Sequence, residues 1–421
     1  MVWTTIAQSL APALHTEPPK NTPTGSFVPP PASGAGTLQF NVYDLSAAIA
    51  RANTLTSATP ALIAALSTSA QALAEFLVDG PHASMVFLSD VLDLGDAERT
   101  FLSGRIGAGV AHLAMDALNY AWMAPAHEII RTRARLGDFI YEYGPAQHLA
   151  MTEAKGSVRR AATAGGALTT ARRAYQVQVD PWIYRTSQMP PGVLIEHGYA
   201  VAFAACPSGA SPAAAHLALV ETRLPPGGSG GGSGSPHPGV GVGGAGPTSG
   251  PAAGAGGATR VGQPRVDIAL LNYRTVFQLA NAPSVVRAID WLRGIDRAVP
   301  PAEFAQTFNV MESDAVEFLV GSDPVDAAIQ HWMSSGARPL FAIRRRPAEQ
   351  FLDWLKSMIT GMPTPPALAI ELSSPLRRSA GAAHTLFTDG FGLIDRNSRF
   401  KGVFKWIARR GSDRPPTPHS R

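Results

Sequence analysis

Cysteine is almost absent from this 421-residue chain, in which Cys206 is the only one. A single cysteine excludes a disulfide framework within the chain and fits a reducing compartment. The apolar neighbours of Cys206 predict a core position rather than a nucleophile. The chain also lacks a basic N-terminal region followed by an apolar run, and it has no uninterrupted apolar stretch of about 18 residues. The sequence therefore predicts a cytoplasmic protein with no membrane partner.

Three common catalytic signatures are missing as well. The eleven histidines show no paired spacing such as HExxH, so a zinc site is not predicted. No GxSxG elbow for a catalytic serine occurs. The glycine-rich run in "GRIGAGVAH" lies inside a helix-like segment rather than between a strand and a helix, which argues against a nucleotide cradle.

Glycine (41 residues) and proline (36 residues) are plentiful, but they gather in a few stretches that divide the chain. Such stretches cannot bury enough apolar surface to fold, so we expect them to be disordered or flexible. The predicted organisation is a disordered tail at 1–37, an α/β domain at 38–224, a flexible linker or insertion at 225–264, a mostly helical α+β region at 265–412 and a loose basic tail at 413–421.

Hydrophobic periodicity within 38–224 predicts an α/β (α+β) fold, with one mixed sheet flanked by helices. The expected helices are 60–80, 103–122 and 167–179, and the expected strands are 137–144, 148–156, 192–206 and 215–224. In the second region we expect helices from 266 to 295 and at 301–310, 314–321, 323–336 and 347–362, with strands at 367–372 and within 384–408. Asp389 and Asp395 lie in "TDGFGLID", where we expect a turn at "DG" rather than a site.

The strand pair "GDFIYEYG" and "HLAMTEAKG" carries the most suggestive charged residues. Asp138 opens the first strand, and Glu153 and Lys155 stand near the end of the second, two apart and therefore on one face. Two carboxylates make an oxygen-rich site of the kind that Mg²⁺ prefers. A lysine beside them stabilises negative charge that develops on an attacked phosphate. The alternative is an ordinary surface ion pair, with Asp138 capping a turn.

This "D…EAKG" arrangement resembles the PD-(D/E)xK nuclease-like superfamily, and it is similar to an uncharacterised bacterial group with the same strand end. The resemblance implies a restriction-endonuclease-like core, a Mg²⁺ cofactor held by Asp138 and Glu153, and Lys155 as the aid to the attacking water. Gln178 matches the glutamine of a "QxxxY" element found in some branches, although residue 182 is Trp rather than Tyr. We also expect Gly156 to let the backbone turn away from the metal.

Two further acids are candidates within the same resemblance. Glu98 is the only plausible acid for the preceding helix. Glu142 lies four residues after Asp138, on the same face of the strand, and could replace it as the first acid.

Basic clusters predict DNA as a partner. The net charge is only +4, but positive charge is concentrated in "RTRAR" (131–135), around Arg172 and Arg173, and in "IRRRP", where Arg344 and Arg345 are the candidate phosphate contacts. The leading hypothesis is a Mg²⁺-dependent nuclease that hydrolyses DNA. The alternative is a catalytically inactive, nuclease-derived scaffold that binds DNA or a partner protein.

Overall fold

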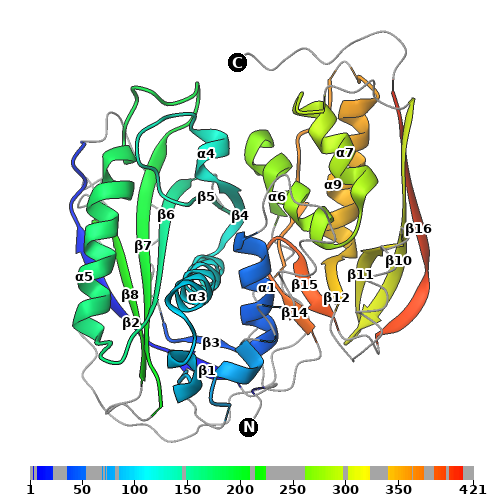
Figure 1. Cartoon of the computed structure of the whole chain (residues 1–421). Coiled ribbons are helices and arrows are strands. Elements are labelled where there is room, and N and C mark those ends of the chain that lie inside the picture. Colours follow the sequence, from blue (N-terminus) through cyan, green and yellow to red (C-terminus); the bar gives the residue numbers. More distant parts are fainter. Residues whose placement is uncertain are drawn as a thin grey trace, which may run out of the picture.

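The computed structural model of the chain describes the following residues: 3, 7–21, 36–53, 69, 72, 74–80, 85–144, 148–208, 214–223, 261–296, 302–322, 340–362, 364–373, 384–394 and 398–410. They form two lobes that lie side by side (Figure 1).

The N-terminal lobe is built on a mixed six-stranded sheet with the spatial order β2-β8-β7-β6-β5-β4. β2 runs parallel to β8 and β6 runs parallel to β7, whereas the other neighbours are antiparallel. β7, at the centre of the sheet, is buried along almost its whole length, as is typical of a strand covered on both faces. The strands are β2 (Pro12–Glu17), β4 (Tyr120–Pro125), β5 (Phe139–Tyr143), β6 (Leu149–Val158), β7 (Ile195–Cys206) and β8 (Ala214–Thr222).

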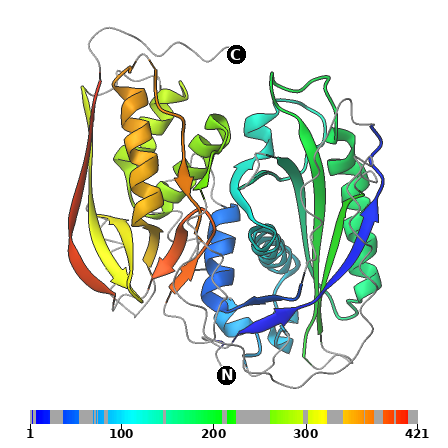
Figure 2. The ribbon, with the colours of Figure 1, turned by 180° about the vertical axis from the view of Figure 1, so that it is seen from behind.

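Helices cover both faces of this sheet (Figure 1). α3 packs across one face, mainly on β6, and α5 packs on β7 and β8 from the other. Two short strands, β1 and β3, pair beside the sheet (Figure 2). The predicted α/β class, a mixed sheet flanked by helices, is confirmed. The elements are β1 (Gln8–Leu10), β3 (Leu38–Phe40), α1 (Val42–Asn53), η1 (Ser89–Leu92), α3 (Asp96–Ala117), α4 (Ala126–Ile129), α5 (Ala164–Ala174), the π turn η2 (Tyr175–Val179) and the 3-10 turn η3 (Asp180–Trp182).

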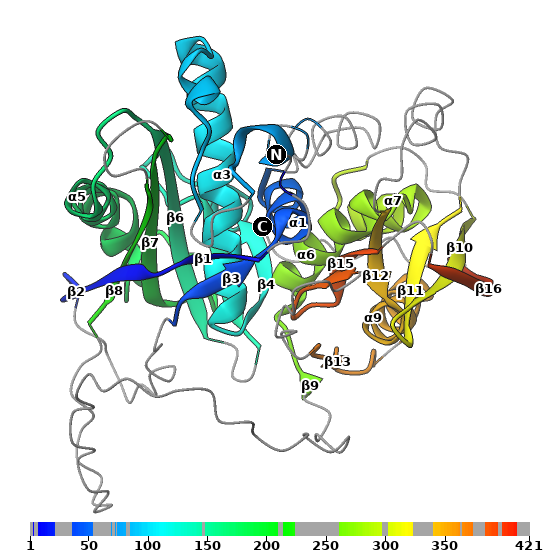
Figure 3. The ribbon, with the colours of Figure 1, turned by 90° about the horizontal axis from the view of Figure 1, so that it is seen from below.

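The C-terminal lobe contains an antiparallel six-stranded sheet with the order β14-β15-β12-β11-β10-β16. α7 and α9 pack on it, and β9 and β13 form a separate small pair (Figure 3). The elements are β9 (Val261–Gly262), α6 (Val266–Leu279), α7 (Pro283–Leu292), β10 (Glu303–Ser313), β11 (Val316–Gly321), β12 (Leu340–Arg344), α9 (Arg345–Ile359), β13 (Ile370–Glu371), β14 (His384–Leu386), β15 (Phe391–Ile394) and β16 (Arg399–Arg409).

In the described part of 265–412, strands are as extensive as helices, which differs from the mostly helical region expected there. The segments 301–310 and 314–321, expected as helices, form the hairpin of β10 and β11. Asp314 and Ala315 turn the chain with φ values of 48° and 63°, as a two-residue hairpin turn requires, although the sequence there lacks the usual Asn-Gly signal. The expected helices 266–295 and 347–362 and the strands within 384–408 are confirmed. The expected strand 367–372 shortens to β13, and the expected helix 323–336 lies outside the described residues.

The predicted disorder of the 1–37 tail is wrong for residues 7–21. β2 extends the main sheet by pairing with β8, about 200 residues later in the chain. Composition does not reveal a strand whose hydrogen bonds come from a distant sheet edge, and Pro12 at its first position is compatible with an edge strand. Of the predicted 225–264 linker, residues 225–260 lie outside the described part of the chain, as does the predicted tail at 413–421.

The helix expected at 103–122 spans 96–117 instead, and β4 occupies the residues that follow. Asn119 adopts a left-handed conformation with φ 64°, which ends the helix and redirects the chain. Ser103 does not start the helix: it is buried within it and donates its hydroxyl to the Thr100 carbonyl at 3.1 Å. Most of the expected helix 60–80 lies outside the described residues. Cys206 is buried, as predicted.

Buried polar side chains join the two lobes between α1 and α6. Arg51 donates to the Asp389 carboxylate at 2.9 Å and to the Asn272 carbonyl at 3.0 Å. Asn272 also donates to Asp389 at 3.0 Å, and its side-chain oxygen accepts the backbone N–H of Met123 at 2.8 Å. The turn expected at Asp389 is present, and its carboxylate neutralises a fully buried guanidinium.

Candidate functional site

The open edge of β6 is where the predicted acids and lysine meet. Pairing between β5 and β6 ends at Phe139 and Thr152, whereas β6 continues beside β7 as far as Val158. Among the described residues, no strand covers the free side of β6 after Thr152. Asp138 lies at this junction and accepts the backbone N–H of Ala154 at 2.9 Å. Beyond Thr152 the Asp138 carboxylate, rather than a neighbouring strand, accepts a backbone hydrogen bond from this edge of β6.

Glu153 and Lys155 project from the same face of β6. Lys155 donates from Nζ to Oε1 of Glu153. The Glu153 side chain is fully buried, while that of Lys155 is 40% exposed. A partly exposed ammonium is therefore paired with a fully buried carboxylate.

Burial raises the pKa of both carboxylates. Burial and the neighbouring Asp138 charge raise the pKa of Glu153 to about 7, against the opposing influence of Lys155 and Gln178. Burial likewise raises the pKa of Asp138, against the Ala154 N–H, the Lys155 charge and a hydrogen bond with Glu153. Two neighbouring carboxylates whose pKa values are both raised by burial are more typical of a functional site than of an ion pair that only stabilises the fold.

Gln178 lies beside the predicted acid Glu153. It lies on the π turn η2, where its side chain approaches Glu153, and its Nε2 donates to the Leu136 carbonyl at 3.1 Å. Trp182 stands four residues later, at the position of the expected Tyr. Its Nε1 donates to the Arg135 carbonyl at 2.8 Å. Trp182 thus departs from the "QxxxY" pattern, but its N–H anchors the backbone at Arg135.

The donor set fits a divalent cation in part. Oε2 of Glu153 is buried and has no hydrogen-bond partner among the described residues, so its lone pairs are available to a cation. In the described part of the chain, no three His, Cys, Asp or Glu side chains converge as a metal cluster. Two carboxylates suit Mg²⁺, which commonly takes one or two carboxylates and completes its shell with water and substrate oxygens.

The expected role of Gly156 is wrong. β6 does not turn away there but continues to Val158. Gly156 faces α3, on the side of the sheet opposite Glu153, where a Cβ would collide with the Ser103 carbonyl oxygen and meet the backbone of Gly107 at 3.1 Å. The glycine therefore permits close helix–strand packing and does not make room for a metal.

Two other candidate acids lie away from the site. Glu98 is exposed in the first turn of α3, and α3 covers the opposite face of the sheet. Glu142 is buried at the lobe interface, where both of its oxygens accept the backbone N–H of Arg265 at 3.0 Å. Asp138 is thus the first acid of the constellation.

Three of the four arginines expected to contact DNA are engaged in ion pairs. Arg172 pairs with Glu17 at 2.7 Å, and Arg173 is exposed beside it. In the C-terminal lobe, Arg344 and Arg345 pair with acids at 3.0 Å or less. Their partners are Glu371, Glu317 and Glu349.

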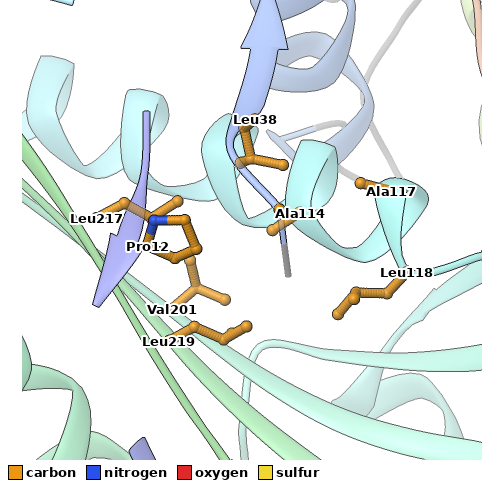
Figure 4. Close-up of a pocket in the computed structure, with 9 residues that line it drawn as sticks. Pro12, Leu38, Ala114, Ala117, Leu118, Val201, Leu217 and Leu219 are labelled. Carbon is orange, nitrogen blue, oxygen red and sulfur yellow. The ribbon is translucent and has the colours of Figure 1, made fainter. Parts of the chain in front are cut away.

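A separate pocket lies on the α3 side of the sheet (Figure 4). It contains no charged or hydroxyl side chain and so offers no catalytic group. Its lining residues are Pro12, Gly36, Leu38, Ala114, Ala117, Leu118, Val201, Leu217 and Leu219.

Comparison with known proteins gives no assignment: no family model, no curated protein and no solved structure matches this chain. In the described residues, no helix combines the length and apolar character needed to cross a bilayer.

Proposed function

We propose that the N-terminal lobe is a Mg²⁺-dependent nuclease of the PD-(D/E)xK type, acting on the phosphodiester bonds of DNA. The observation that carries the proposal is the convergence of Asp138, Glu153 and Lys155 at the open edge of β6. The topology supports it, because a mixed sheet flanked by helices presents the first acid from one strand and the second acid and lysine from the next.

Each side chain has a distinct task in this proposal. Asp138 and Glu153 would hold Mg²⁺, which supplies Lewis-acid polarisation of the phosphate when bound. Lys155 keeps its ammonium near the attacked phosphate and stabilises the negative charge that develops there. Gln178 limits the freedom of Glu153 by packing beside it.

Cleavage of supercoiled plasmid by the full chain, with and without Mg²⁺, tests the proposal. We expect Mg²⁺-dependent nicking that Lys155→Ala lowers by roughly 100-fold or more, because removing one group that stabilises charge in the transition state has about that effect. Lys405→Ala, which removes an exposed lysine on β16, is the matched control and should cleave like the unaltered protein.

Glu153→Gln provides a second, independent variant. It should abolish cleavage, yet in EDTA at about pH 8 it should unfold at a higher temperature than the unaltered protein, because it removes a buried charge beside Asp138. Equal cleavage by the unaltered protein and Lys155→Ala contradicts the proposal. DNA binding without any cleavage supports the inactive scaffold instead.

A further inference from the structure

The loop that leads into Asp138 is strongly basic. We call residues 131–137 the arginine loop. Arg131, Arg133 and Arg135 are all exposed. None of the three forms an ion pair with any residue that the structure describes, in contrast to Arg172, Arg344 and Arg345. Three uncompensated guanidinium groups close together on one loop are available to an anionic partner.

The arginine loop is held against the site by two side-chain donors from the turn after α5. Gln178 donates to the Leu136 carbonyl at 3.1 Å, and Trp182 donates to the Arg135 carbonyl at 2.8 Å. The Trp182 ring also carries the Arg185 guanidinium 4.8 Å from its centroid, which adds a fourth positive charge. Gln178 thus lies beside Glu153 and also fixes the basic loop.

The distance from this loop to the acids suits a nucleic-acid backbone. Arg135 precedes Asp138 by three residues and Arg131 by seven, so their Cα atoms lie within about 11 Å and about 25 Å of that of Asp138. Along one DNA strand, with a rise of about 3.4 Å per nucleotide, this reach covers roughly three to seven phosphates.

We propose that the arginine loop binds the phosphates of a DNA duplex next to the bond at Asp138, and that Gln178 and Trp182 position the loop. The proposal rests on the function proposed above and names how that site holds its substrate. Phosphate contacts carry no sequence information, so the loop supplies affinity and register without base preference.

Binding of fluorescent duplex DNA by the full chain in EDTA, measured by anisotropy over a NaCl series, tests the proposal without cleavage. R131A/R133A/R135A should weaken binding roughly tenfold or more near 100 mM salt and flatten the slope of log Kobs against log salt by about 2 to 3, at 0.9 per lost phosphate contact. The loss should be equal on two duplexes of unrelated sequence. R399A/R409A/R410A, which removes three exposed charges from the far edge of the other lobe (Figure 1), should match the unaltered protein.

Trp182→Phe tests the positioning role. It keeps an aromatic ring but removes the N–H that anchors Arg135, so the salt slope should flatten while all the arginines remain. An unchanged slope in Trp182→Phe overturns the positioning role.

The outcomes separate the two proposals. An unchanged slope in R131A/R133A/R135A, or a loss confined to one duplex, overturns the role of the loop even if the protein cleaves DNA. Loss of DNA binding in that variant, in a protein that never cleaves, supports the loop and rejects hydrolysis. Failure of the unaltered protein to bind DNA at low salt overturns both.

Discussion

Glu153 has properties that a purely structural ion pair does not explain. Its partner Lys155 is 40% exposed while Glu153 itself is fully buried, and a second carboxylate, that of Asp138, stands beside it. One of its oxygens has no hydrogen-bond partner among the described residues. A fold that gained stability from this position would replace the acid by an amide or an apolar side chain, so its presence favours a chemical role.

Glu142 is a second buried acid, and it has a structural role: its carboxylate accepts the backbone N–H of Arg265 at the lobe interface. Burial raises its pKa to about 8, against the Arg265 backbone N–H and guanidinium, while Asp267 raises it further. The folded state thus favours the protonated form. The stability that this provides is fully present below the ordinary pKa of 4.5 and is lost as pH rises through about 8.

Glu142→Gln should therefore change the pH dependence of unfolding. Gln resembles the protonated acid and retains an oxygen that accepts the Arg265 N–H. We expect melting temperatures close to those of the unaltered protein near pH 5, and higher by roughly 2 °C or more near pH 9. Thermal unfolding over this pH range checks it, with Glu303→Gln, at a half-buried position on β10, as control. Parallel curves for Glu142→Gln and the unaltered protein would contradict the assignment.

At the scale of elements, β6 packs against α3 on one face and against η2 on the other. Its odd-numbered residues, including Glu153 and Lys155, face η2 and the candidate site. Its even-numbered residues face α3, as the contact of Thr152 with Met115 shows. Gly156 lets α3 pack closely on β6, because it has no Cβ to collide with the Ser103 carbonyl. This packing fixes the position of β6 and so of Glu153.

Gly156→Ala should accordingly destabilise the protein by about 3 kcal/mol, at the upper end of the cost of overpacking a core, because its Cβ would collide with the Ser103 carbonyl. Gly104→Ala is the matched control on α3, since no atom lies within 4 Å of a Cβ there; it should be neutral or stabilise by up to about 1 kcal/mol. Urea unfolding measures both. Equal stability of the two variants would show that the close approach is not required.

At the scale of the whole molecule, the two lobes share one buried interface. Arg51, Asn272 and Asp389 come from α1, α6 and the turn before β15, so the network exists only when both lobes are folded and docked. His112 adds an apolar contact across the same interface, because its ring stacks 5.0 Å from that of Phe387. The C-terminal lobe is therefore packed against α1 and α3 of the N-terminal lobe.

Asp389→Ala should destabilise the full chain by about 3–5 kcal/mol, because it leaves the Arg51 guanidinium buried without its anion. Glu303→Ala breaks the exposed ion pair with Arg409 and should leave the unfolding midpoint nearly unchanged. Denaturant unfolding, followed by the fluorescence of tryptophans in both lobes, checks this. A wild-type midpoint for Asp389→Ala would mean that the lobes do not depend on this pair.

Local patterns predicted the parts of the fold that local physics controls. The alternating strand "FIYEY", the strand "LAMTEAKG" and the helix over 167–179 follow from periodicity, and the spacing of Glu153 and Lys155 places them on one face of β6. The hairpin at Asp314 and Ala315 was missed because its turn uses residues without a strong left-handed preference. The edge strand β2 was missed because its partner β8 lies about 200 residues away.

By itself, the sequence determined an α/β chain with a strand that presents an acid and a lysine on one face, because side-chain alternation is a property of the single strand. The tertiary structure alone decided that Asp138 joins them while Glu98 and Glu142 do not, since that depends on strand register and on which face α3 covers. It also decided which arginines are neutralised and which are available. Charge compensation depends on neighbours that only folding brings together.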